Sequence, residues 1–338
     1  MFKTRVISSV FLVAIALVTI LLGGPVLIIT VAAISLIGMQ ELYNAMGVVK
    51  TDNRPGNRNA GKTDPAGQSG DGNAVKTNPA SQSGDGNAVK TNPSGRSGDG
   101  NDEKINPVSQ PDKKNIPEDK KLSQKFNILT VMGFAGALGY DAVIYFCPEP
   151  YYLVGVVASL TLVLMVYVFT FPRFQAEEVM TVFFGVVYVA VMLGFIYVTR
   201  MGANGIILVW LIFLSSWGAD TCAYLVGRKL GKHKMAPVLS PKKSIEGAIG
   251  GVVGAGIFGL IFGFLFRQPA GRYFVICAAG ALISMVGDLA ASAIKRDKEI
   301  KDYGKLIPGH GGILDRFDSV IFTAPVIYFL SLLLIGAK

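Results

Sequence analysis

Long runs of apolar residues, separated by short polar segments, dominate the pattern of this 338-residue chain. A helix needs about 20 mostly apolar residues to cross the hydrocarbon core of a bilayer. Nine runs come close to that length, at residues 6–22, 25–40, 126–147, 151–171, 179–198, 204–222, 245–266, 273–294 and 319–336. The pattern therefore predicts an all-α, polytopic membrane protein with about nine transmembrane helices.

The first apolar run resembles a signal peptide, but no small-x-small cleavage site follows it, and the second run begins soon afterwards. We therefore expect an uncleaved first span. Because Lys3 and Arg5 precede this span, the positive-inside rule predicts a cytoplasmic N-terminus. The crossings then make four further segments cytoplasmic, at residues 41–125, 172–178, 223–244 and 295–318.

Basic residues gather in two of these predicted cytoplasmic loops. The loop 223–244 contains Arg228, Lys229, Lys232, Lys234, Lys242 and Lys243 without an acidic residue, and the loop 295–318 contains Lys295, Arg296, Lys298, Lys301, Lys305 and Arg316. The basic residues of the predicted external turns are Arg200, Arg267 and Arg272. This asymmetry supports the proposed topology, and anionic lipid alone could attract so basic a surface.

A polar segment at residues 51–125 interrupts the apolar pattern. Four copies of a 14-residue repeat run from Pro55 to Gln110, and none has enough apolar side chains to offset the entropy of ordering it. The sequence thus predicts three regions: a two-helix membrane segment at 1–50, a disordered cytoplasmic linker at 51–125 and a catalytic transmembrane domain at 126–338. A calcium-binding or partner-binding array is the alternative for the repeats.

Composition agrees with the membrane assignment. Hydrophobic residues make up 51% of the chain and charged residues 16%, whereas a soluble domain has about 25% charged residues. The three cysteines are scattered in or beside apolar runs, which argues against a disulfide framework or a zinc site.

Two aspartates lie inside predicted spans, Asp220 in WGADTCAYLVG and Asp288 in LISMVGDLAASAIKR. An ionised carboxylate within a span is unfavourable by a few kcal/mol, so such residues usually face a polar cavity and mark a functional site. The alternative is an acid that is protonated or neutralised by a lysine of a neighbouring helix.

The stretch PGHGGILDRFD, residues 308–318, places more polar residues at the edge of the last span. Asp315 and Asp318 share one face if this segment is helical, and the glycines form a tight turn whose N–H groups could bind an anion. Carboxylates beside many lysines and arginines suit Mg²⁺ shared with phosphate groups, as in phosphoryl or nucleotidyl transfer. His310 is a candidate base or phosphate contact, and a structural role within its glycine turn is equally compatible with the sequence.

A third polar stretch, SPKKSIEG at residues 240–247, precedes a glycine-rich span. Ser240 and Pro241 resemble a helix start. We expect Lys242 and Lys243 to face the same interface as the other basic loop, although two lysines before a span are usually determinants of topology.

Together these segments resemble the CDP-diacylglycerol synthase (phosphatidate cytidylyltransferase) family. The run SAIKRDKEIKDYGKLIPGHGGILDRFD, residues 292–318, is similar to the signature of that family, and WGADTCAYLVGRKLGKHKMAP and SPKKSIEGAIGG match it in order and spacing. The resemblance covers residues 126–338 and is strongest over 204–320. Many members have Glu where this chain has Ala291, which leaves the completion of a metal shell open.

The resemblance implies that CTP and phosphatidic acid are converted to CDP-diacylglycerol and pyrophosphate with Mg²⁺, with a second, monovalent cation left open. It implies Asp288 and Asp315 as metal ligands and Asp220 and Asp318 as helpers or nucleotide contacts. The residues implied for phosphate contacts or loop organisation are Lys295, Arg296, Ser240, Lys242, Lys243, His310 and Arg316.

The resemblance also implies a bacterial cytoplasmic membrane protein whose active site faces the cytoplasm. Membrane lipid is an expected partner, nucleic acid is not, and a homodimer is left open. Two alternative functions stay open: a CTP-dependent polyprenol or dolichol kinase, and a secondary transporter whose intramembrane aspartates couple ions.

Overall fold

The computed structural model describes residues 13–48, 127–307 and 311–336, which all belong to one compact unit. The predicted linker at 51–125 lies outside the described residues. In this unit α2 (Gly24–Met46) packs against the region after residue 126, where it contacts α3 (Ile128–Phe146), α5 (Ala176–Gly185), α6 (Met192–Met201) and α11 (Leu314–Ile335).

The prediction of an all-α, polytopic membrane protein is confirmed. Within the described residues, eight helical segments are long and apolar enough to cross a membrane. The first predicted span, 6–22, is described only as the short helix Val13–Leu22. The remaining helices are α4 (Tyr152–Thr170), α7 (Gly205–Phe213), α8 (Ala219–Leu230), α9 (Ile245–Leu265) and α10 (Ala270–Asp297), with a 3₁₀ turn η1 (Glu149–Tyr151) before α4.

Two of the spans contain a π-helical turn. The segment η2 (Val186–Val191) joins α5 to α6, and η3 (Leu214–Gly218) joins α7 to α8. Such turns are rare and occur frequently at functional sites. The span predicted at 204–222 continues as helix from Gly205 to Leu230, and Asp220 is the second residue after the π-helical turn η3.

Local sequence explains several helix ends. The Asn127 side chain accepts a hydrogen bond from the Thr130 N–H at 2.8 Å and so caps α3. The Ser244 hydroxyl accepts one from the Gly247 N–H at 3.1 Å and caps α9. The helix start inferred at Ser240 and Pro241 is therefore wrong, because those residues begin a strand and the capping serine comes four residues later.

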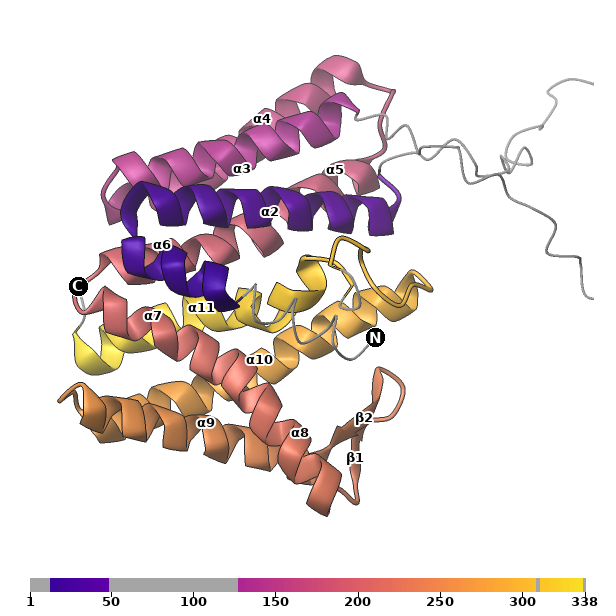
Figure 1. Cartoon of the computed structure of the whole chain (residues 1–338). Coiled ribbons are helices and arrows are strands. Elements are labelled where there is room, and N and C mark those ends of the chain that lie inside the picture. The colour runs from indigo at the N-terminus through magenta and orange to yellow at the C-terminus, as the bar shows by residue number, and fades with distance from the viewer. Residues whose placement is uncertain (1–12, 49–126, 308–310, 337–338) are drawn as a thin grey trace, which may run out of the picture. The chain divides into compact units, whose positions relative to one another are not determined.

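A small antiparallel hairpin separates α8 from α9. It consists of β1 (Lys234–Ala236) and β2 (Ser240–Ser244), with Lys234 opposite Ser244 and Ala236 opposite Ser240. Figure 1 shows the hairpin at the end of the bundle where α2 finishes and where α10 also ends. The described end of α2, the hairpin and the end of α10, which all belong to segments predicted to be cytoplasmic, thus lie at the same end of the bundle.

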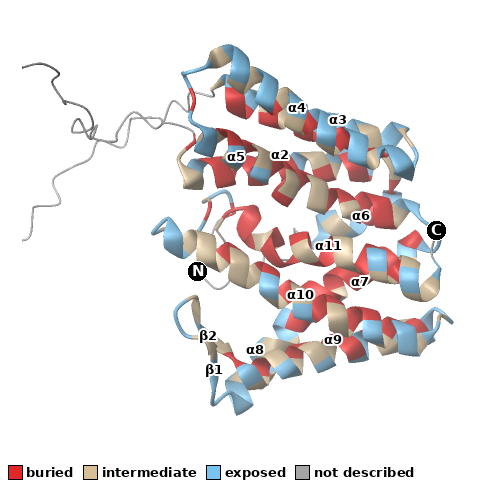
Figure 2. Cartoon of the chain, turned by 180° about the vertical axis from the view of Figure 1, so that it is seen from behind, coloured by how far each residue is buried: buried red, intermediate tan, exposed pale blue. Residues whose placement is uncertain are grey.

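Burial follows the pattern expected of helices in lipid. Helices α2, α6 and α11 have many buried residues, whereas α4 exposes most of its apolar side chains (Figure 2). Exposed apolar surface on a membrane helix faces lipid tails, and helical backbone satisfies its own hydrogen bonds there. The central helix α11 packs against α10 and α6, which positions its polar first turn beside the end of α10.

Candidate functional site

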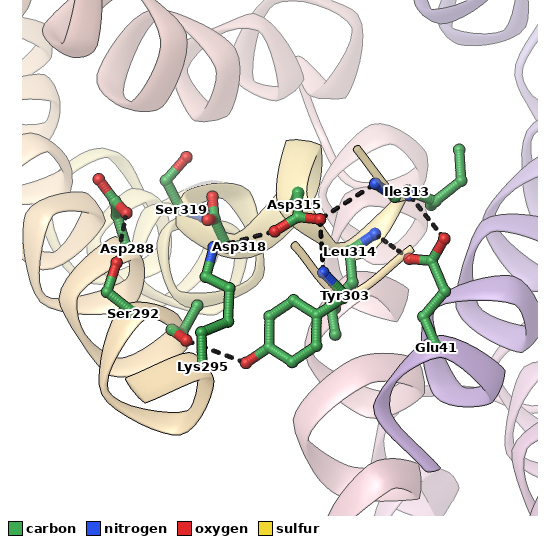
Figure 3. A network of polar contacts seen from close by, with 12 residues as sticks. Glu41, Asp288, Ser292, Lys295, Tyr303, Ile313, Leu314, Asp315, Asp318 and Ser319 are labelled. Atoms are coloured by element: carbon green, nitrogen blue, oxygen red, sulfur yellow. Dashed lines mark hydrogen bonds and ion pairs between the residues drawn. The ribbon is translucent and has the colours of Figure 1, made fainter. Parts of the chain in front are cut away.

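The first turn of α11 contains Asp315, a buried carboxylate with three hydrogen-bond donors around it. One oxygen, Oδ1, accepts from Lys295 Nζ at 2.9 Å. The other, Oδ2, accepts from the backbone N–H groups of Tyr303 at 2.8 Å and Gly312 at 3.0 Å. Asp315 therefore joins the end of α10, the loop after it and the start of α11 (Figure 3).

The loop between α10 and α11 is closed by short backbone contacts. The Ile307 N–H donates to the Gly311 carbonyl at 2.9 Å, and these two residues flank the segment 308–310, which lies outside the described residues. Gly311 has φ +88°, a left-handed conformation that favours glycine. His310 lies outside the described residues, so its proposed role stays a prediction.

Tyr303 is the buried side chain that anchors this loop. Its hydroxyl donates to the Ala291 carbonyl at 3.0 Å, and its ring lies 5.3 Å from Lys295 Nζ. Burial raises the pKa of the Tyr303 hydroxyl well above its ordinary value. The phenol therefore stays neutral and acts as a donor that orients the loop against α10.

Glu41, on α2, caps the first turn of α11 from the other side. Its carboxylate accepts from the Ile313 N–H at 3.1 Å and from the Leu314 N–H at 2.8 Å. Helix N-termini favour negative charge because their first N–H groups have no partner within the helix. Two acidic side chains, Glu41 and Asp315, thus bind the N–H groups of three consecutive residues, 312 to 314.

A second ion pair, between Lys243 and Asp288, joins the hairpin to α10. Asp288 also accepts a long hydrogen bond of 3.4 Å from the Ser292 hydroxyl, one helical turn further along. The base of the hairpin is held by Glu246, whose carboxylate accepts from the backbone N–H groups of Lys232 and His233 and contacts His233 Nδ1 at 2.6 Å. The hairpin, which Glu246 stabilises at its base, therefore positions Lys243 beside Asp288.

Asp220, Asp318 and Arg316 complete the charged cluster. Asp220 lies within electrostatic reach of Asp288, Lys243 and Arg316, and Asp318 lies within electrostatic reach of Asp288, Lys295 and Asp220. In the view of Figure 3, Asp318 lies between Asp288 and Asp315. The structure thus gathers four carboxylates (Asp220, Asp288, Asp315, Asp318) and three cationic side chains (Lys243, Lys295, Arg316), which we call the charged cluster.

Three other residues implicated by the sequence lie at its margin. Lys242 and Arg296 are exposed, and Ser240 is half-buried in β2 opposite Ala236. These positions can contact a bound molecule that extends from the cluster towards solvent, and their roles stay predictions.

The donor set of the cluster fits a hard divalent cation. Among the described residues, no three His, Cys, Asp or Glu side chains converge into a ready-made metal cage. Mg²⁺ does not need one, because it is commonly held by one or two carboxylates together with waters and phosphate oxygens. Carboxylates outnumber cationic side chains in the cluster by one, and Asp288 and Asp315 each use an ammonium group as their counter-cation.

Reasoning from sequence missed Glu41, Tyr303 and Tyr188. Glu41 follows the apolar run 25–40 directly, so the rule that singled out Asp220, an acid near the end of a span, would also have found it. Tyr188 lies on η2, and its buried hydroxyl has no hydrogen-bond partner among the described residues although it is coupled electrostatically to Asp318 and Asp288. No sequence signal distinguishes the two tyrosines from ordinary core residues.

Comparison with known proteins places this cluster within a family. The profile of the cytidylyltransferase family matches residues 115–334. A Staphylococcus epidermidis protein named phosphatidate cytidylyltransferase is 37% identical over 181 residues, which are 53% of this chain and 68% of that protein. A Staphylococcus aureus protein of the same name is 38% identical over 180 residues, again 53% and 68%. The matched region contains every residue of the charged cluster, and the chain belongs to the cytidylyltransferase family.

Proposed function

We propose that this protein is a phosphatidate cytidylyltransferase, which converts CTP and phosphatidic acid to CDP-diacylglycerol and pyrophosphate. The observation that carries the proposal is the charged cluster itself, in which acidic and cationic side chains from α8, β2, α10 and α11 meet at one end of a membrane-spanning bundle. That position suits a reaction between a water-soluble nucleotide and a lipid headgroup.

The chemistry requires no strong general base from the protein. The phosphomonoester of phosphatidic acid is largely dianionic at neutral pH, by analogy with a second phosphate pKa near 6. One of its oxygens attacks the α-phosphorus of CTP and forms a new P–O bond. The bond from that phosphorus to the oxygen bridging to the β-phosphate breaks, and pyrophosphate leaves with that oxygen and the electron pair.

The main barrier is the repulsion between two polyanions. Lys243, Lys295 and Arg316 supply positive charge where these phosphates would meet. Phosphate oxygens can compete with Asp288 and Asp315 for the ammonium groups, since both lysines already form charge-assisted contacts there. Cations held in place before the reaction stabilise charge that develops at the phosphorus without reorganising during the step.

Asp288 and Asp315 would hold Mg²⁺, with Asp318 and Asp220 as neighbouring carboxylates. When bound, Mg²⁺ neutralises phosphate charge and orients the two substrates. The protein contributes the placement of these ligands, because Asp315 is fixed by two backbone N–H groups and Asp288 by the Ser292 hydroxyl. We also propose that this end of the bundle faces the cytoplasm, where CTP is found.

Transfer of label from CTP tests the proposal and separates it from its rivals. Purified protein in mixed micelles with phosphatidic acid and Mg²⁺ should move label from the α-phosphate of CTP into the lipid fraction. A lipid kinase would instead move label from the γ-phosphate. A transporter would show uptake into proteoliposomes that does not depend on phosphatidic acid.

A variant and its control connect this activity to the charged cluster. Asp288→Asn should abolish transfer while the protein stays inserted in the membrane, because the amide removes a charge from the proposed metal centre. Glu177→Gln makes the same chemical change at an exposed position on α5 and should leave transfer unchanged. Normal activity of Asp288→Asn would argue strongly against this site.

A further inference from the structure

Helix α2 lies outside the segment that matches the family profile, yet one of its side chains contacts the site. The family match begins at residue 115, and α2 ends at Met46. Glu41 reaches across 272 and 273 residues of sequence to the N–H groups of Ile313 and Leu314. A segment beyond the matched region therefore touches the turn that carries Asp315.

The Glu41 carboxylate is buried and tightly packed against the loop before α11. The residue is 7% exposed, and a Cβ added at either Gly304 or Gly312 would collide with its carboxylate oxygens. Both glycines belong to the loop between α10 and α11, and a side chain at either position would displace the Glu41 carboxylate. Figure 3 shows the carboxylate directed at the first turn of α11.

Hydrogen bonding to the backbone explains a carboxylate at this position. Among the described residues, no lysine, arginine or histidine forms an ion pair with Glu41. Its hydrogen-bond partners among the described residues are both backbone N–H groups, and the negative charge of Asp315 nearby opposes a second acid. The two N–H groups at a helix N-terminus, where the helix dipole also favours negative charge, offset part of the cost of burying this carboxylate.

We infer that Glu41 is a positioning residue for the transfer reaction, an inference that rests on the proposed function. Glu41 binds the N–H groups of residues 313 and 314, while Asp315 binds that of Gly312 with one oxygen and Lys295 with the other. Glu41 thereby holds the backbone of the residues that directly precede Asp315. Helix α2 is consequently part of the catalytic unit, although the predicted linker and the family boundary separate it in sequence.

Glu41→Gln is the informative variant because it keeps the shape of the side chain. An amide has one acceptor oxygen, so one of the two N–H groups loses its acceptor and faces an NH₂ donor instead. The first turn of α11 should shift, and a displacement of about 1 Å can lower a rate up to about 100-fold. We expect kcat to fall by about 10- to 100-fold and the Mg²⁺ concentration for half-maximal activity to rise, with KM for CTP less affected.

The variant Gly312→Ala perturbs the same contact by changing the loop instead of Glu41. Its methyl group collides with the Glu41 carboxylate and should reproduce the loss of kcat and the shift in Mg²⁺ dependence. Because both changes act on one contact, the double variant Glu41→Gln/Gly312→Ala should be far less impaired than the product of the two single effects. Glu177→Gln serves as the control for the Glu-to-Gln change and should behave as wild type.

Amide hydrogen exchange supplies a readout that does not need activity. In Glu41→Gln, peptides that contain the amides of Ile313 and Leu314 should exchange faster than in wild type, while peptides from α4 and α9 should not change. Kinetics are compared for protein that elutes as a single folded species in detergent, so that loss of folded enzyme does not imitate a slower reaction.

The outcomes separate this inference from the proposed function. Wild-type kcat and Mg²⁺ dependence in Glu41→Gln, measured against an active wild type, would overturn the positioning role. Unchanged exchange at residues 313 and 314 would overturn it as well, whether or not the wild type is active. A wild type that forms no CDP-diacylglycerol would refute the proposed function, and the exchange experiment would still decide whether Glu41 holds the turn.

Discussion

Lys243 and Lys295 form a matched pair for testing how the charged cluster works. Each ammonium group contacts one aspartate, Asp288 or Asp315, and both are proposed to bind substrate phosphates. Replacement by methionine keeps most of the apolar stem and removes the charge. We expect both variants to lose activity but only Lys295→Met to be strongly destabilised.

The difference follows from how far each aspartate is buried, because the aspartate keeps its charge when its lysine is removed. The side chains of Lys295 and Asp315 are 14% and 3% exposed, whereas those of Lys243 and Asp288 are 24% and 27% exposed. Removing one partner of a buried pair destabilises a protein by about 3 kcal/mol or more, because the other charge is left buried, whereas a carboxylate that keeps contact with solvent loses about 1 kcal/mol or less. Two backbone N–H groups still bind Asp315 in Lys295→Met, so the lower end of the buried range applies, and the two variants should differ by about 2 kcal/mol.

Unfolding in detergent and label transfer measure the two effects separately. Stability is followed by titrating SDS into protein held in dodecylmaltoside and recording tryptophan fluorescence. Activity is measured on the folded fraction, where loss of one cation that stabilises developing charge should lower kcat by about 100-fold. Equal destabilisation of the two variants, or wild-type kcat in either of them, would refute the reasoning.

Three further changes test other parts of the molecule. Deleting residues 53–120 should leave activity near wild type, because the predicted linker contributes no residue to the proposed chemistry; a collapse of activity in purified protein would show that the repeats matter catalytically. Asp141→Leu should raise stability by about 1–3 kcal/mol without changing kcat, since both carboxylate oxygens of this buried residue lack a hydrogen-bond partner among the described residues; lower stability in the same SDS titration would contradict this. Tyr303→Phe removes the bond to the Ala291 carbonyl and should lower stability by about 1 kcal/mol. Because burial raises the pKa of Tyr303, the hydroxyl is neutral over the working range, and the alkaline limb of the pH–rate profile should not move in the variant.

The polar residues of the site could largely be found from sequence, because the bilayer makes them conspicuous. An acid within or beside a span, such as Asp220 or Asp288, is unfavourable unless it has a function or a partner. The glycine turn and the spacing of Asp315 and Asp318 also point to the loop before α11. The same rule applied to the end of the second span would have added Glu41.

Which lysine contacts which aspartate could not be predicted from the positions of polar residues along the sequence. Lys243 contacts Asp288 because a hairpin, and not the expected helix start, presents it to α10. Lys295 contacts Asp315 because the loop after α10 folds back and Tyr303 fixes it with its hydroxyl and its backbone N–H. These contacts depend on local backbone geometry that hydrophobic periodicity does not report.

The sequence by itself determined that this is a helical membrane protein, where its spans lie, and that its charges gather in a few loops at span ends. Transfer from water to lipid depends on composition along each segment, so these properties can be read one segment at a time. Only the tertiary structure decided which carboxylate meets which ammonium group, and that α2 holds the first turn of α11 through Glu41. Those contacts depend on the depth and rotation of each helix against its neighbours, and packing among all the helices sets both.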